Sequence, residues 1–304
     1  MMLVAEQIVN GLQLGVMLFL ISAGLTLVFG VMGLVNLTHG SLYMIGAYVG
    51  ATVVNKTSSF ILGGLCGIAA AAAAGGAVEF LVLRQLYQRS FLDQVLATYG
   101  LILFFNEGTT ILWGRQPIYT DIPAMLASSV DLLPGFSYQV YRLFIIAVGL
   151  MVAAGLYILI TKTRIGMLIR AGATHRDMVR ALGINIRLLY TAIFGLGALL
   201  AGLAGFLAAP IFAVQVGMGE QILVLGFVVI IIGGVGSIRG ALAGAVLVGL
   251  VDTLTRAFLP GLFRSVMEAN QASSLGAALS SIVVYLLMAI ILIWRPKGLF
   301  PANQ

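Results

Sequence analysis

The sequence predicts an all-α integral membrane protein, a polytopic bundle of about eight to ten transmembrane helices. Hydrophobic residues make up 61% of the 304 residues and charged residues only 9%, whereas soluble domains average about 45–50% and about 25%. No charged residue occurs between Glu6 and Lys56, a stretch long enough for two membrane helices. Most basic residues fall in short segments between apolar stretches. This composition excludes both a water-soluble enzyme and a disordered chain.

The charge-free stretches predict nine spans, and we interpret residues 1–304 as a single transmembrane domain. The spans lie near residues 8–30, 36–54, 60–83, 94–113, 142–161, 188–211, 221–235, 240–257 and 277–294. Those at 221–235 and 240–257 are short and contain glycine. We expect broken or re-entrant helices there, which lipid tolerates only where protein or water covers the backbone.

The distribution of Lys and Arg predicts the orientation of the bundle. With nine spans and the N-terminus outside, eleven of the 16 basic residues lie in inside loops. Six of the eleven fall in the loop at 162–187, which is therefore expected to be cytoplasmic. A cytoplasmic excess of basic residues also accounts for the net charge of +6 without a nucleic-acid partner.

Small residues four positions apart recur within the predicted spans, for example Gly46/Gly50, Ala198/Gly202 and Ala201/Gly205. Lipid is as apolar as the helix surfaces, so helices in a membrane associate largely through close contact of their backbones. These pairs therefore predict ordinary packing faces of a helix bundle.

Catalytic and cofactor chemistry is not expected in this chain. One cysteine, Cys66, excludes a disulfide framework and a cysteine-based zinc site, and two histidines argue against a histidine-rich metal centre. The nearest match to a phosphate-binding P-loop begins at Gly50 but has Asn55 where the second glycine must turn. We therefore predict no enzymatic activity, no catalytic residue, no metal site and no cofactor.

The basic loop at 162–187 is the most informative segment. Thr174 followed by Asp177 is a helix start signal, with a hydroxyl to cap free amides, and Gly183 is a helix stop. Three apolar residues between these signals fall near one face at helical spacing: Met178, Ala181 and Leu182. Such a helix fits a groove on another protein. It fits equally well a position on the lipid headgroups, with its arginines on anionic lipid.

Polar residues open the second predicted span, where Asn36, Thr38, His39 and Gly40 follow one another closely. Polar groups at membrane depth are costly and often face a cavity, so these four residues are candidates for a translocation pathway. Hydrogen bonding at a helix end is the alternative role for His39.

Four segments resemble permease subunits of ABC importers, and most closely the LivH-type permeases for branched-chain amino acids. Residues 170–185 (RAGATHRDMVRALGIN) resemble the loop that couples such permeases to their ATPase. The other three segments are residues 30–48, 232–245 and 294–301. The resemblance therefore extends over nearly the whole chain.

The resemblance implies a multi-pass subunit of the bacterial inner membrane that carries branched-chain or related amino acids inward. Its implied partners are a second homologous permease, two ABC ATPase subunits that bind the ATP, a periplasmic solute-binding protein and membrane lipid. It also implies a set of ATPase-coupling residues: Arg170, Ala171, Thr174, Asp177, Met178, Ala181, Leu182 and Gly183. Urea or other amides are alternative cargo. A self-sufficient secondary transporter is the alternative class, but it predicts coupling charges within the spans, and few occur.

Overall fold

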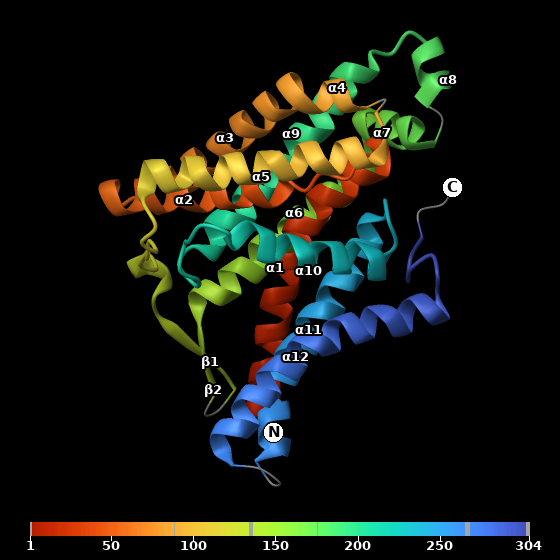
Figure 1. Cartoon of the computed structure of the whole chain (residues 1–304). Coiled ribbons are helices and arrows are strands. Elements are labelled where there is room, and N and C mark those ends of the chain that lie inside the picture. The colour runs from red at the N-terminus through yellow and green to blue at the C-terminus, as the bar shows by residue number, and fades with distance from the viewer. Residues whose placement is uncertain (1, 88, 134–135, 175, 265–267, 302–304) are drawn as a thin grey trace.

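The structure is a bundle of long helices, which confirms the predicted all-α membrane fold (Figure 1). This computed structural model describes residues 2–87, 89–133, 136–174, 176–264 and 268–301. Within these ranges, seven helices are long and apolar enough to cross a membrane. Helices occupy all nine predicted positions: α1 (Met2–Met32), α2 (His39–Thr57), α3 (Phe60–Val78), α5 (Phe91–Trp113), α6 (Val140–Lys162), α9 (Ile186–Ala208), α10 (Met218–Gly233), α11 (Ile238–Phe263) and α12 (Ala269–Trp294).

The helices α2 and α10 are the two that fall outside this group of seven. The helix α10 has only 16 residues, in keeping with the short span predicted near 221–235. The helix α2 begins at His39, three residues later than the predicted span. The reason is a turn before the helix, in which the Asn36 Oδ1 accepts a hydrogen bond of 3.0 Å from the backbone N–H of Thr38.

The prediction of a short or broken helix at 240–257 is wrong, because α11 runs without interruption over 26 residues. Its glycines permit close packing instead of breaking the helix. A Cβ on Gly244 would lie 2.6 Å from the carbonyl oxygen of Val229 in α10, and one on Gly249 would lie 2.5 Å from the carbonyl oxygen of Gly11 in α1. The helix Ile238–Phe263 extends beyond the predicted span 240–257 at both ends, and it includes Pro260 in its last turn.

The helices form two similar halves joined by α6. The first half contains α1, α2 and α3, and the second contains α9, α10 and α11. From the first half, α1 packs on α11, and α2 packs on α9 and α3. From the second half, α9 packs on α3, and α10 packs on α1 and α11. The contacts are thus reciprocal when α1, α2 and α3 exchange with α9, α10 and α11. Five long helices precede α9, namely α1, α2, α3, α5 and α6. Because five is an odd number of crossings, α9 runs in the direction opposite to α1, as in the inverted repeats of transporters.

The centre of the bundle is formed by α1 and α9, the most buried of the long helices. They cross at two glycines, where a Cβ on Gly24 would lie 2.9 Å from the carbonyl oxygen of Gly197. The beginnings of α2 and α10 meet in the same way, because a Cβ on Gly40 would overlap the backbone of Gly219. The outer helices α5, α6 and α12 are largely exposed along their length.

The shorter elements distinguish the two ends of the bundle (Figure 1). One end holds the N-terminus and a two-stranded antiparallel β-hairpin that the sequence did not predict. The other, called the α8 end, holds the helices α7 and α8 and the C-terminal tail. The bounds of the shorter elements are η1 (Glu79–Leu83), α4 (Arg84–Leu86), η2 (Ala124–Leu126), β1 (Ser129–Leu133), β2 (Phe136–Gln139), α7 (Arg164–Thr174) and α8 (Arg176–Ala181).

We expect the substitution Gly205→Ala to destabilise the bundle, because a Cβ there would overlap the carbonyl oxygen of Tyr43 in α2. Overpacking of this kind costs about 1–3 kcal/mol. Gly195→Ala, in the same helix, has no atom within 4 Å of its new Cβ and should be neutral or stabilising by up to about 1 kcal/mol. Thermal unfolding of the two purified variants in detergent tests this. Equal midpoints would contradict the close contact between α2 and α9.

Candidate functional site

The predicted helix in the basic loop is present as α8, and it forms a short two-helix segment with α7, here called the α7–α8 segment. The helix α7 precedes it, and the Thr163 Oγ1 accepts a hydrogen bond of 3.1 Å from the backbone N–H of Gly166 in the first turn of α7. Gly183 follows α8 with a φ of 81°, so the predicted glycine stop is confirmed. The Asn185 Oδ1 then accepts a hydrogen bond of 3.2 Å from the backbone N–H of Leu188 and caps α9.

The predicted capping role of Thr174 is wrong. Thr174 is the last residue of α7, and its hydroxyl donates a hydrogen bond of 3.0 Å to the carbonyl oxygen of Arg170 one turn earlier. A threonine within a helix commonly bonds to the carbonyl four residues before it. The sequence signal failed because the helix α7 was not expected. The side chain of Asp177 lies outside the described residues.

Three apolar side chains of α8 and the residue directly after it are exposed. Met178 is 63% exposed and Leu182 is 73% exposed, and Ala181 is also exposed. Val179, on the other side of the helix, is 3% exposed and anchors α8. Two large exposed apolar side chains at one end of a helix are a small interaction surface. We call it the α8 face and define it by Met178, Ala181 and Leu182.

The helix α7 connects the α8 face to the centre of the bundle. It packs on α6, α1 and α9, and Gly172 faces the two central helices. A Cβ there would lie 3.2 Å from the Leu189 side chain in α9 and 3.8 Å from the Val31 side chain in α1. Of the other predicted coupling residues in α7, Arg170 is exposed and Ala171 is half-buried. The helix α7 therefore links the α8 face to both central helices.

An ion pair with a fully buried carboxylate lies near the start of α9, and no sequence pattern predicted it. The Glu79 carboxylate, fully buried, accepts hydrogen bonds from Arg84 (3.1 Å from Nη2), from the Tyr87 hydroxyl (2.6 Å) and from the Thr191 hydroxyl (2.9 Å). The Arg84 Nη2 also donates to the Thr191 Oγ1 at 3.0 Å. Burial, followed by the bond to Glu79, raises the pKa of Tyr87 above its ordinary value, so the phenol stays a donor.

The ion pair depends on a local change of helix type. Glu79 and Arg84 are five residues apart, and such residues do not share a face of an α-helix. The chain forms a π-helical turn at Glu79–Leu83, which brings them together. Because Thr191 lies in the second turn of α9, the pair ties the end of α3 to the helix that directly follows α8.

The four predicted pathway residues lie together where α2 begins, and all four are buried. The Thr38 hydroxyl donates a hydrogen bond of 3.2 Å to the carbonyl oxygen of Thr98 in α5, and the His39 Nε2 lies 3.2 Å from the carbonyl oxygen of Ile21 in α1. The imidazole fills the space between the crossing glycines, since a Cβ on Gly24 would lie 2.9 Å from Nε2. These contacts fit a packing role for His39.

Asn36 differs from its neighbours in this group. Its Nδ2 is buried and has no hydrogen-bond partner among the described residues, whereas its Oδ1 is engaged in the turn with Thr38. A buried amide without a partner costs free energy, and in native proteins such groups often serve a function. Its position at the start of a helix inside the bundle is one at which transporters bind their substrates.

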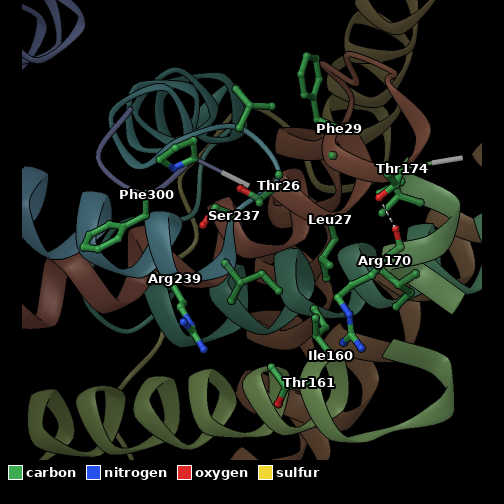
Figure 2. A pocket seen from close by; sticks show the side chains of 18 of the residues that line it. Thr26, Leu27, Phe29, Ile160, Thr161, Arg170, Thr174, Ser237, Arg239 and Phe300 are labelled. Carbon is green, nitrogen blue, oxygen red and sulfur yellow. Dashed lines mark hydrogen bonds between the residues drawn. The ribbon is translucent and has the colours of Figure 1, made fainter. Parts of the chain in front are cut away.

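The four segments that carry the family resemblance meet at the α8 end around one cavity of about 1080 Å³ (Figure 2). The tail closes one side by pairing with the end of α10. The backbone N–H groups of Leu299 and Phe300 donate hydrogen bonds of 2.9 Å to the carbonyl oxygens of Ile232 and Gly233. None of the four predicted pathway residues lines this cavity.

Comparisons with known proteins agree with the resemblance. A family profile described as "Branched-chain amino acid transport system / permease component" matches residues 7–292. The chain is 27% identical to the high-affinity branched-chain amino acid transport system permease protein BraD of Pseudomonas aeruginosa, over 97% of this chain and 94% of the relative. It is also 27% identical to the permease protein LivH of Escherichia coli, over 86% and 89%. No solved structure matches the chain.

We expect Glu79→Ala to destabilise the protein by about 3 kcal/mol or more, because it leaves the partly buried Arg84 without its counter-ion and cuts α3 from α9. Asp252→Ala is the matched control, since Asp252 pairs only with Arg256 in its own helix and that arginine is 51% exposed. Its removal should cost about 1 kcal/mol or less. Thermal unfolding in detergent compares the two, and equal losses would contradict a structural link through Glu79.

Proposed function

Because the chain belongs to the family of branched-chain amino acid transport system permease components, we propose that it is the membrane-spanning subunit of an ABC importer. It carries branched-chain or related amino acids inward, and separate ATPase subunits supply the energy. The permease works with a second homologous permease, two ATPase subunits and a periplasmic solute-binding protein, in the inner membrane of a bacterium. Relatives named for branched-chain amino acids support this cargo over urea and other amides.

The observation that carries the proposal is the exposed α8 face, which lies on the α7–α8 segment, and this segment packs on the central helices α1 and α9. Met178 and Leu182 are too exposed to stabilise the bundle itself, so burial against another molecule is what would make them favourable. The buried Val179 in α8 and the close contact at Gly172 in α7 fix the α7–α8 segment to the bundle. The α8 end is the cytoplasmic side by the distribution of basic residues, where ATPase subunits would dock.

The buried carboxylates disfavour a self-sufficient secondary transporter. Ion coupling in such proteins uses carboxylates that change protonation or bind cations inside the membrane. Here Glu79 is engaged by Arg84, and Asp252 by Arg256. Both acids thus have a structural counter-ion within the described part of the chain.

For the cargo we propose a path at the beginning of α2. Asn36, Thr38, His39 and Gly40 lie inside the bundle rather than at its surface, and the free Nδ2 of Asn36 is a donor suited to a carboxylate. The close contact of Gly40 with Gly219 places the starts of α2 and α10 side by side. Helix starts of this kind favour anionic groups of a substrate.

Reconstitution tests the assignment to an importer. The chain alone in proteoliposomes is expected to give no uptake of leucine above protein-free vesicles, with or without an ion gradient. Together with its ATPase subunits, second permease and binding protein, uptake should depend on ATP. Leucine flux through the chain alone would overturn the proposal in favour of a secondary transporter or channel.

Substitution of Met178 tests the α8 face. Met178→Asp and Met178→Lys should each reduce the co-purification of ATPase subunits at least tenfold, because either charge opposes burial in an apolar groove. Met167→Asp is the matched control: this methionine of α7 is 55% exposed but lies outside the α8 face, and recovery of the ATPase should be unchanged. If only the aspartate at 178 reduced recovery, a position of α8 on anionic headgroups would be favoured instead.

A further inference from the structure

The cavity at the α8 end forms a chamber between α1, α6, α7 and the C-terminal tail. Apolar side chains make up much of its wall, among them Leu27, Ile160 and Phe300. Figure 2 shows Arg170 and Arg239 reaching into the region beside α6, each from a different element. The chamber therefore combines a largely apolar wall with two guanidinium groups.

The charged lining residues that the structure describes are both basic. None of the described lining residues is acidic, and neither arginine takes part in an ion pair among the residues that the structure describes. The Arg239 Nη2 donates a hydrogen bond of 3.2 Å to the Tyr157 hydroxyl, and its guanidinium lies 5.2 Å from the ring centre. Thr26 also lines the chamber, and its hydroxyl is buried without a hydrogen-bond partner in the described structure. The two guanidinium groups and the Thr26 hydroxyl can therefore donate hydrogen bonds to a bound anion.

A second, apolar cavity of about 320 Å³ adjoins the chamber. The two share Tyr157, Ile238 and Arg239. The rest of its wall is apolar: Phe19, Leu150, Ala153, Ala154 and Leu242. From position 157 to position 150 this slot extends roughly 10 Å along α6, away from the α8 end. Leu150 and Ala154 are exposed, so the slot opens on the outer surface of the bundle.

We propose that the chamber and the slot together bind one anionic glycerophospholipid of the membrane leaflet at the α8 end. Arg170 and Arg239 hold its phosphate, and an acyl chain lies in the slot. A basic chamber at the membrane boundary with an apolar extension toward the hydrocarbon matches the two parts of such a molecule. The inference does not depend on the importer assignment, because it rests on the two cavities and their charge alone.

Two other occupants fit the cavities less well. A soluble phosphate would use the arginines but leave the slot unfilled. The carboxylate of an amino acid could pair with the arginines, but its ammonium group would find no acidic partner among the described lining residues and would be repelled by the guanidinium groups. The bound lipid would touch α6, α7 and the start of α11 at once. The bound lipid would therefore fix the position of the α7–α8 segment, which carries the α8 face.

Native mass spectrometry of the full-length chain in detergent tests the proposal, with dioleoylphosphatidylglycerol and dioleoylphosphatidylcholine as probes. Phosphatidylglycerol should bind more tightly. Arg170→Gln and Arg239→Gln should each weaken it about fivefold, the effect of one basic residue at a membrane surface. Arg187→Gln, an exposed arginine at the same end that does not line the cavity, is the matched control and should bind as the original chain does.

The slot needs a separate variant. Ala154→Phe fills it from the exposed side, so the fold should be preserved, which circular dichroism verifies. It should weaken binding of phosphatidylglycerol, whereas glycerol 3-phosphate should compete poorly in every variant. Equal affinity for the two lipids, unchanged binding in both arginine variants or in Ala154→Phe, tight competition by glycerol 3-phosphate, or displacement of the lipid by leucine would each overturn the proposal.

Discussion

Close contact between glycine backbones is the constraint on which the rest of this bundle depends. Lipid removes most of the hydrophobic drive that packs helices in water, so short distances between main chains must supply the attraction. The crossing of α1 with α9 at Gly24 and Gly197 is of this kind, and so is the meeting of α2 with α10 at Gly40 and Gly219. These contacts bury the two central helices and leave only a small space between them, which the imidazole of His39 fills.

The α8 end connects the two halves of the bundle. The α7–α8 segment contacts α1 and α9, and the Glu79 cluster ties the first turns of α9 to the end of α3. Because α1 and α3 belong to one half and α9 to the other, the proposed docking of ATPase subunits on the α8 face would act on both halves.

Much of the fold could be predicted from the sequence, because the features concerned are local. Charge-free stretches place all nine helices, and Gly183 ends α8 as its backbone freedom suggests. Properties that depend on a change of helix type or on distant segments could not be predicted. The pairing of Glu79 with Arg84 requires a π-helical turn, and the cavity needs four segments spread from residue 26 to residue 301. The packing of His39 likewise depends on distant segments, because its ring lies where Gly24 of α1 crosses Gly197 of α9.

The pairing of the tail with α10 has a consequence for handling the protein. The carbonyl oxygens of Ile232 and Gly233 would have no helical partner, since α10 ends there, and the main chain of Leu299 and Phe300 supplies one. Leu299 and Phe300 thus cover the open end of α10. A shortened gene ending before Leu299 would leave both main-chain acceptors without these donors and loosen the wall of the neighbouring chamber.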